Sequence, residues 1–319
     1  MKRIGVLTSG GDAPGMNAAI RAVTRTALGK GMEVIGFVGG YDGLIDRNTM
    51  VLDKRTVGGI LQFGGTVLKT ARSKRFMTDY GVDAAVETLD FYGIDALVVI
   101  GGDGSFRGAE ELSRRGICVM GLPGTIDNDM GYTDYTIGFD TAVNTVIEAI
   151  GKIKDTAIAH NKITIIEVMG RHCGDIALYS GLTGGAEYIM LPELELDIDG
   201  LIEKINEGIE RHKHHCLIIK AEGVPVTNAE LSAIITERTG QEPREVVLGF
   251  LQRGGSPSAR DRLIASKMGA YAVELIDKDT ASRAIGLQGR EITAMDLTKA
   301  IGIKREADLE LMGLMYDLA

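Results

Sequence analysis

Short apolar runs alternate with stretches of helical periodicity along most of the chain. The runs that predict strands span residues 3–8, 33–38, 95–102, 117–122, 163–170, 188–192 and 216–223, with a last run after Glu245. A helix is expected after Gly10 and Gly11, through about Leu28, and further helices over about 105–114, 139–159, 174–182, 199–211 and 260–276. The apolar runs are nearly continuous rather than alternating, which is typical of parallel strands covered on both faces. This rhythm predicts an α/β protein with two αβα layered units.

Composition narrows the class of protein. The chain has 319 residues, 45% of them hydrophobic, and a net charge of −9, which argues against a nucleic-acid partner. No apolar run approaches the ~20 residues that span a membrane. The three cysteines are odd in number and widely spaced, and the N-terminus enters a strand without a signal-peptide pattern. We therefore expect a cytoplasmic protein without disulfides.

Glycine-rich segments follow the predicted strands. They read "TSGGDAPG" (8–15), "GGDGS" (101–105), "PGTIDND" (123–129), "GRHCGD" (170–175), "AEG" (221–223) and "QRGG" (252–255). Because the carboxyl ends of parallel strands meet at one edge of a sheet, these segments predict a phosphate site. In "GGDGS", glycines surround the single carboxylate of Asp103, which could hold Mg²⁺ beside phosphate oxygens. The alternative is an Asp that caps a helix in a glycine turn.

Asp127 and Asp129 lie almost side by side after "LPGTI". Two carboxylates so close repel each other unless a cation, a proton or hydrogen-bond donors compensate. The pair fits phosphoryl transfer, in which one carboxylate accepts the proton of the attacking hydroxyl and the other lies near a metal ion. The alternative is a turn with two solvated acids.

Two basic runs interrupt the acidic chain. "LKTARSKRF" (68–76) holds Lys69, Arg72, Lys74 and Arg75, and we expect one arginine to reach a phosphate and the others to be solvated. "RHKHHC" (211–216) contains neighbouring histidines that enter a strand on opposite sides. No second cluster of metal-binding residues follows, so this run favours a basic surface patch over a metal site.

Seven segments together resemble the ATP-dependent bacterial 6-phosphofructokinases over nearly the whole chain. They are "GVLTSGGDAPGMNAAIR", "VVIGGDGS", "GLPGTIDND", "TIGFDTA", "IEVMGRHCGDIAL", "AEGV" and "LQRGGSP". The resemblance implies transfer of the γ-phosphoryl group of ATP to the 1-hydroxyl of fructose 6-phosphate, which gives fructose 1,6-bisphosphate in glycolysis. The alternatives are a pyrophosphate-dependent or broader sugar-phosphate kinase, and a nucleotide or sugar-phosphate sensor without catalysis.

The resemblance also implies two similar αβα three-layer domains with mostly parallel sheets and an active site in the cleft between them. Residues 1–138 plus about 253–305 would bind ATP. Residues 139–252 plus about 306–319 would bind fructose 6-phosphate. The family further implies a homotetramer with shared active sites, in which Lys162 and Arg244 reach the sugar phosphate of a neighbouring subunit.

Catalytic roles carry over from the family motifs. Asp127 would be the general base with Thr125 beside it, and Arg72 and Arg171 would stabilise charge on the transferring phosphoryl group. Asp103 and Asp129 would serve Mg²⁺. The positions that match the family's ATP contacts are Gly11, Arg72, Ser73, Phe76, Gly102, Asp103, Gly104, Ser105, Arg107 and Gly108. Those that match its sugar-phosphate contacts are Thr125, Asp127, Lys162, Met169, Gly170, Arg171, Glu222, Arg244, Phe250 and Arg253.

Some positions depart from the family pattern or distinguish its branches. Pyrophosphate-using relatives carry Asp at position 104 and Lys at 124, so Gly104 and Gly124 favour ATP. Lys162 replaces a usual Arg and Phe250 a usual His, which predicts weaker sugar-phosphate binding. The effector site for ADP or phosphoenolpyruvate would comprise Arg21, Arg25, Lys54, Lys154, Gly185, Glu187, Arg211 and Lys213. Weak regulation is expected, since Lys54, Arg55 and Gly59 differ from the common residues.

Overall fold

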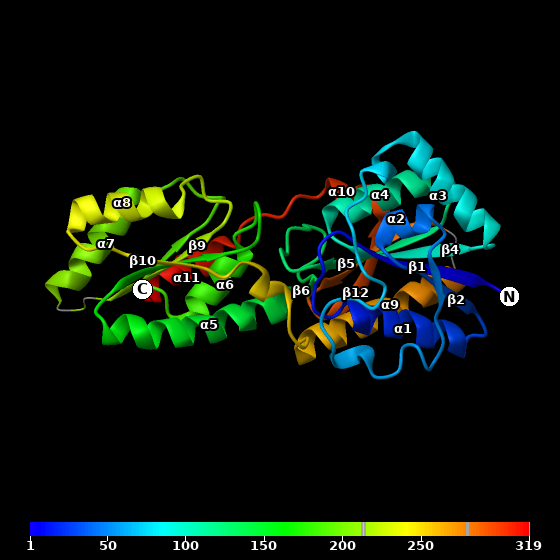
Figure 1. Ribbon diagram of the computed structural model, residues 1–319, viewed down its shortest axis with the longest axis horizontal. Helices are drawn as coiled ribbons and strands as arrows, with labels where there is room; N and C mark the ends of the chain where they lie inside the picture. Colours follow the sequence, from blue (N-terminus) through cyan, green and yellow to red (C-terminus); the bar gives the residue numbers. More distant parts are fainter. Residues whose placement is uncertain (212, 214, 279–280, 319) are drawn as a thin grey trace. The chain divides into compact units, whose positions relative to one another are not determined.

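The structure is a computed structural model that describes residues 1–211, 213, 215–278 and 281–318. The chain divides into two compact units (Figure 1). Unit 1 comprises Met1–Ile126, Met130–Thr141 and Arg253–Arg305. Unit 2 comprises Asp127–Asp129, Ala142–Gln252 and Glu306–Ala319. The expected assignment of ATP to one unit and the sugar phosphate to the other stays a prediction.

Unit 1 is built on a mostly parallel sheet. Its strands are β1 (Arg3–Ser9), β2 (Glu33–Phe37), β3 (Thr49–Val51), β4 (Ala96–Gly101), β5 (Val119–Thr125), β6 (Ile137–Gly138), β11 (Arg283–Gln288) and β12 (Glu291–Asp296). The order is β12-β11-β5-β4-β1-β2-β3, and β6 pairs with β5. The inner strands are parallel, whereas β3 and β12 lie antiparallel at the edges. All of β4 is buried, as a strand covered on both faces requires.

Helices cover both faces of this sheet (Figure 1). They are α1 (Met16–Gly29), α2 (Gly40–Ile45), α3 (Asp79–Phe91), α4 (Asp103–Arg114), α9 (Ala259–Lys278) and α10 (Leu297–Gly302). Helices α1 and α9 pack together on one face, where Gly269 of α9 lets the two helices approach closely. On the other face, Phe37, Leu97 and Phe106 form a buried core with residues of α2, α3, α4 and α10.

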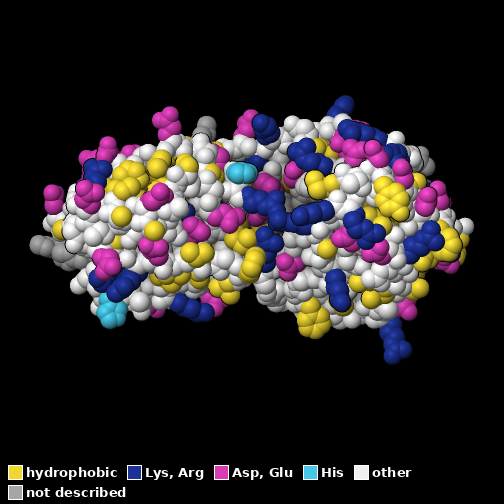
Figure 2. All heavy atoms as spheres, turned by 45° about the horizontal axis from the view of Figure 1, so that its top comes forward, with side chains coloured by type: hydrophobic (Ala, Val, Ile, Leu, Met, Phe, Trp, Pro, Cys, Tyr) yellow, Lys and Arg dark blue, Asp and Glu magenta, His cyan; other side chains and the backbone are white. Residues whose placement is uncertain are grey.

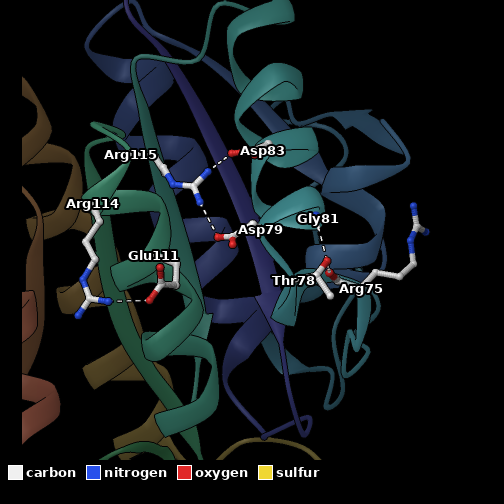
Figure 3. Close-up of polar contacts among 8 residues, drawn as sticks. All are labelled: Arg75, Thr78, Asp79, Gly81, Asp83, Glu111, Arg114 and Arg115. Carbon is white, nitrogen blue, oxygen red and sulfur yellow. Dashed lines mark hydrogen bonds and ion pairs between the residues drawn. The ribbon is translucent and has the colours of Figure 1, made fainter.

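Ion pairs tie α3 to the end of α4 (Figure 3). Arg115 follows α4, and its guanidinium contacts Asp79 at 2.9 Å and also Asp83, both on α3. The Thr78 hydroxyl caps α3 by accepting the Gly81 N–H at 3.2 Å. These contacts are surface features with modest individual energies. They join α3, the helix that follows the basic run 68–76, to the end of α4.

Unit 2 is a smaller α/β unit whose sheet has the order β10-β7-β9-β8 and parallel pairing. Its strands are β7 (Ile163–Val168), β8 (Tyr188–Met190), β9 (Cys216–Ala221) and β10 (Arg244–Val247). Its helices are α5 (Phe139–Ala159, which begins in unit 1), α6 (Asp175–Gly184), α7 (Ile198–Glu210), α8 (Asn228–Thr239) and α11 (Leu309–Leu318). Figure 1 shows α8 and α5 on opposite sides of the sheet. The α/β class with mostly parallel sheets is therefore confirmed.

A buried lysine interrupts the apolar core around the sheet of unit 2. Lys220 on β9 is 1% exposed, and its ammonium lies 2.7 Å from the Glu167 carboxylate on β7. The two residues are register partners in the parallel ladder. Because an unpaired buried cation would be costly, this ion pair makes the strand sequence "CLIIKA" compatible with a core position.

Several sequence expectations need correction. Strand β5 spans Val119–Thr125, so the expected run 117–122 begins two residues and ends three residues too early. The helix after β4 begins at Asp103 rather than near Ser105. The sequence pattern did not identify the helices α3 and α8 or the antiparallel β11–β12 hairpin.

Among the described residues, no helix is both long and apolar enough for a membrane span. Acidic and basic side chains are interspersed over most of the face shown in Figure 2.

Candidate active site

The "GGDGS" segment forms a tight strand-to-helix turn in unit 1. Strand β4 ends at Gly101, Gly102 is the N-cap, and α4 begins at Asp103. The Ser105 hydroxyl, 4% exposed, donates to the Ser9 carbonyl at 2.9 Å and so joins the turn to the end of β1. The N-terminus of α4 presents backbone N–H groups and the positive end of a helix dipole, an arrangement that favours phosphate.

The glycines of this region have different reasons to be glycine. A Cβ at Gly101 would lie 2.4 Å from the Ser105 hydroxyl, and one at Gly108 would lie 2.8 Å from the Tyr41 ring. A Cβ at Gly124 would lie 2.9 Å from Ile100, so packing alone explains that glycine. At Gly104, by contrast, a Cβ would meet nothing within 4 Å. A helical glycine costs up to ~1 kcal/mol relative to alanine, so Gly104 has no justification in the packing of unit 1.

The other residues expected to contact ATP differ in their exposure and in the contacts of their side chains. Arg72 is exposed. Arg75, from the same basic run, donates a hydrogen bond to Asp46 instead, and this bond lowers the pKa of the Asp46 carboxyl. The Ser73 hydroxyl lies 2.5 Å from an Asp42 carboxylate oxygen. The contacts of the remaining expected residues are as follows. Phe76 is buried and stacks on Tyr41 with ring centroids 4.0 Å apart, Arg107 pairs with Asp103 at 3.0 Å, and Arg253 lies against Gly11.

Asp127 is buried in unit 2, with 4% of its surface exposed. Its Oδ2 lies 3.4 Å from Nε of Arg171, which gives the compensating positive charge that the aspartate pair requires. The alternative of two solvated acids is therefore wrong for Asp127. Asn128, between the two aspartates, adopts a left-handed conformation with φ 53° and is fully buried. Thr125, at the end of β5, belongs to unit 1 and accepts the Thr136 hydroxyl at its carbonyl, at 2.7 Å.

Four of the sugar-phosphate residues of unit 2 lie at the carboxyl ends of two strands, namely Met169, Gly170 and Arg171 after β7 and Glu222 after β9. Gly170 and Arg171 both have positive φ, 132° and 53°, and the Arg171 N–H donates to Glu222 at 2.9 Å. The Met169 N–H donates to the Gln252 side chain at 3.1 Å. Gln252 is fully buried; it begins the "QRGG" segment, but the sequence pattern assigned it no role. These contacts form a connected loop cluster at the strand ends.

Lys162 and Arg244 lie elsewhere. Lys162 immediately precedes β7, and Arg244 begins β10 as the register partner of Thr164. Both therefore lie at the amino end of the strands, whereas Met169 and Arg171 follow β7 at its carboxyl end. The intervening strand has 6 residues at ~3.3 Å each, so the two groups are about 20 Å apart. One small sugar phosphate cannot bridge this distance within a chain.

Phe250 is 80% exposed. Its side chain therefore does not pack into the core of unit 2. Its neighbours Val247 and Leu251 are 61% and 59% exposed, so this segment presents apolar side chains outward. A local group of exposed apolar side chains is typical of a surface that another chain covers.

Part of the expected effector site is visible in unit 2. The Lys154 ammonium donates to the Gly185 carbonyl at 3.1 Å, and Lys213 pairs with Glu187 at 2.6 Å. A pocket of about 80 Å³ is lined by residues that include Glu187, Arg211 and Lys213. Arg21, Arg25 and Lys54 belong to unit 1, where Arg25 and Lys54 are exposed.

Gly59 and the histidine-containing run 211–216 were also singled out in the sequence. Gly59 has φ 75°, a conformation that other residues adopt at a cost. His212 and His214 lie outside the described residues. Across residues 1–211, 213, 215–278 and 281–318, no group of three His, Cys, Asp or Glu side chains could hold a metal ion.

A glycine-rich helix N-terminus and a buried carboxylate beside an arginine are typical of α/β proteins that act on phosphate groups. A family model described as phosphofructokinase matches residues 3–276, and the chain belongs to this family. "ATP-dependent 6-phosphofructokinase" of Clostridium botulinum (strain Loch Maree / Type A3) is 53% identical over 319 residues, covering 100% of this chain and 98% of that protein. The protein of the same name from Clostridium tetani is also 53% identical over the same shares.

Solved structures agree with this family. Phosphofructokinase from Saccharomyces cerevisiae superposes with a TM-score of 0.92 at 34% sequence identity. The match covers 99% of this chain and 50% of the yeast chain, so this chain spans about half the length of that relative.

Proposed function

We propose that this protein is an ATP-dependent 6-phosphofructokinase, which transfers the γ-phosphoryl group of ATP to the 1-hydroxyl of fructose 6-phosphate. The products are fructose 1,6-bisphosphate and ADP, and the reaction is a step of glycolysis. The full-length similarity to relatives of that name supports this reaction. The observation that carries the chemistry is the buried Asp127 carboxylate held 3.4 Å from the Arg171 guanidinium.

In this proposal Asp127 accepts the proton of the 1-hydroxyl as the oxygen attacks the γ-phosphorus. The bond between that phosphorus and the β–γ bridging oxygen breaks, and ADP leaves with the bonding electrons. Arg171 and Arg72 stabilise the charge on the transferring group. Thr125 lies two residues before the base and orients the acceptor. Met169, Gly170, Glu222 and the other sugar-phosphate positions bind the sugar.

ATP is the proposed phosphoryl donor rather than pyrophosphate. Gly104 leaves open space at the N-terminus of α4 that packing in unit 1 does not require. A side chain there would compete with a nucleotide for this space. The glycine-rich turn after β4 and the positions Gly11 and Arg72 complete the proposed nucleotide contacts.

Mg²⁺ fits the chemistry of the expected acids. Asp103 presents a carboxylate that is 42% exposed in the first turn of α4, and hard carboxylate oxygens are the ligands Mg²⁺ prefers. Mg²⁺ usually takes one or two carboxylates together with phosphate oxygens, so Asp103 and Asp129 suffice as protein ligands. When bound, the ion neutralises charge on the phosphates. Arg107, 3.0 Å from Asp103, would exchange that partner for phosphate.

A homotetramer with shared sites accompanies this proposal. Lys162 and Arg244 lie at the amino end of the sheet, too far from Met169 and Arg171 to share one sugar phosphate, which supports a role for them in the site of another copy. The exposed Val247, Phe250 and Leu251 supply apolar surface for such contacts. The enzyme acts in the cytoplasm, and ADP or phosphoenolpyruvate regulates it weakly at the pocket beside Glu187.

A coupled assay tests the proposed reaction. ATP and pyrophosphate should be compared as donors against fructose 6-phosphate and a panel of other sugar phosphates, with and without Mg²⁺. We expect the highest kcat/KM for ATP with fructose 6-phosphate and dependence on Mg²⁺. Preference for pyrophosphate or for another sugar phosphate would instead support the broader kinase. Nucleotide binding without any product would support the sensor.

A further inference from the structure

Asn128 separates the proposed base Asp127 from Asp129 and is fully buried in a left-handed conformation. Its side-chain amide donates to Oδ2 of Asp175 at 2.8 Å. Asp175 is the first residue of α6 and is only 2% exposed. A charge-assisted hydrogen bond between two buried groups is stronger than a neutral one and holds both partners in a single geometry.

The segment 171–175 contacts the aspartate loop at three points. Arg171 Nε lies 3.4 Å from the Asp127 carboxylate, the Cys173 thiol donates to the Asn128 carbonyl at 3.8 Å, and Asp175 accepts the Asn128 amide. The segment 171–175, which supplies the compensating cation Arg171, thus also holds the backbone at Asn128, next to the proposed base Asp127. A shift of the Asn128 peptide would change the direction of the Asp127 side chain.

We infer that Asn128 and Asp175 are positioning residues for phosphoryl transfer, which act through Asp127 without touching the substrates. The inference rests on the proposed function of Asp127. The left-handed backbone at Asn128 supports it, because glycine could adopt this conformation without strain but could not form the bond to Asp175. The asparagine side chain therefore contributes something that the backbone conformation alone does not require.

Asn128→Gly separates these two contributions, since it keeps the backbone conformation and removes the amide. Asp175→Ala removes the same bond from the other side. Either variant should lower kcat by about 10- to 100-fold, the scale of a small misplacement of a catalytic group, with the KM for ATP unchanged. The kcat of the double variant should be no lower than that of the less active single variant, because both substitutions remove the same interaction.

Two further variants keep the inference testable against a loss of folding. Asp175→Asn retains an oxygen that can accept the amide, so its kcat should stay within about 3-fold of the original. Asn161→Gly is the matched control, because Asn161 also has positive φ, 51°, but is exposed at the end of α5. It should leave kcat unchanged.

Unchanged kcat in Asn128→Gly and Asp175→Ala would overturn the inference. Multiplicative losses in the double variant, or kcat losses that follow the melting temperature in every variant including Asp175→Asn, would also overturn it. Failure of the proposed function is distinguishable, since the unsubstituted protein would then phosphorylate no fructose 6-phosphate.

Discussion

Gly104 predicts an unusual pairing of effects, a gain in stability with a loss of ATP affinity. Its Cβ would meet nothing within 4 Å, and no positive φ demands glycine there. Gly104→Ala should therefore stabilise the first turn of α4 by about 0.5–1 kcal/mol, which raises the melting temperature by roughly 1–3 °C. Gly104→Asp should also fold well, because an acid in the first turn of a helix is favourable.

The loss of ATP affinity should depend on charge. An added carboxylate about 5 Å from a phosphate charge costs on the order of 3 kcal/mol at an effective dielectric constant of ~20. That corresponds to about a 100-fold rise in the KM for ATP. Alanine adds only a methyl group, so its effect should be about 10-fold or less. Pyrophosphate carries no nucleoside and no α-phosphate ester, so the Asp variant should weaken it less.

The assay compares melting temperature and the KM values for ATP and fructose 6-phosphate. Gly151→Ala is the matched control, because Gly151 also lies within a helix with nothing within 4 Å of its Cβ. It should stabilise the fold by a similar amount and leave ATP affinity alone. An unchanged KM for ATP in Gly104→Asp would refute the reasoning that this glycine makes room for the donor.

Three further predictions concern other positions. Lys220→Met leaves the Glu167 carboxylate without its buried partner and should lower the free energy of unfolding by about 3 kcal/mol in denaturant titrations; equal stability would contradict the ion pair's role. Burial raises the pKa of Asp261 to about 6 from 3.8, so its contribution to stability is lost as the pH rises from about 4 to 6. Asp261→Asn should remove up to ~3 kcal/mol of the change in the free energy of unfolding between pH 4 and 7. Parallel curves of stability against pH for the variant and the unsubstituted protein would refute this. Phe250→His should lower the KM for fructose 6-phosphate by about 10-fold without changing that for ATP, and an unchanged sugar KM would remove Phe250 from the site.

Elements with strong apolar patterns were predictable from the sequence. The run 3–8 became β1, and the predicted helix over 139–159 has the observed bounds of α5. Helix α3 was missed because small residues such as Ala85 make up much of its buried stripe and weaken the periodic signal. The edge strand β12 is only half-buried and alternates weakly, so its pattern did not stand out.

The chemistry-bearing loops were predictable as segments but not as contacts. Asp127 and Asp129, three and five positions after Gly124, indicated a compensating cation, yet the sequence pattern could not show that Arg171 supplies it. The left-handed conformations of Asn128 and Arg171 and the Asn128–Asp175 bond depend on how distant loops pack. Tertiary contacts of this kind have no periodic signature in one sequence.

The most direct test of the central claim is the turnover of Asp127→Asn with ATP and fructose 6-phosphate. The substitution keeps the shape of the side chain and removes its ability to accept the proton of the 1-hydroxyl. We expect kcat to fall by a factor on the order of 10²–10⁴, the usual contribution of general-base catalysis, while ATP binding is little changed. Near-normal turnover in this variant would contradict the assignment of Asp127 as the base.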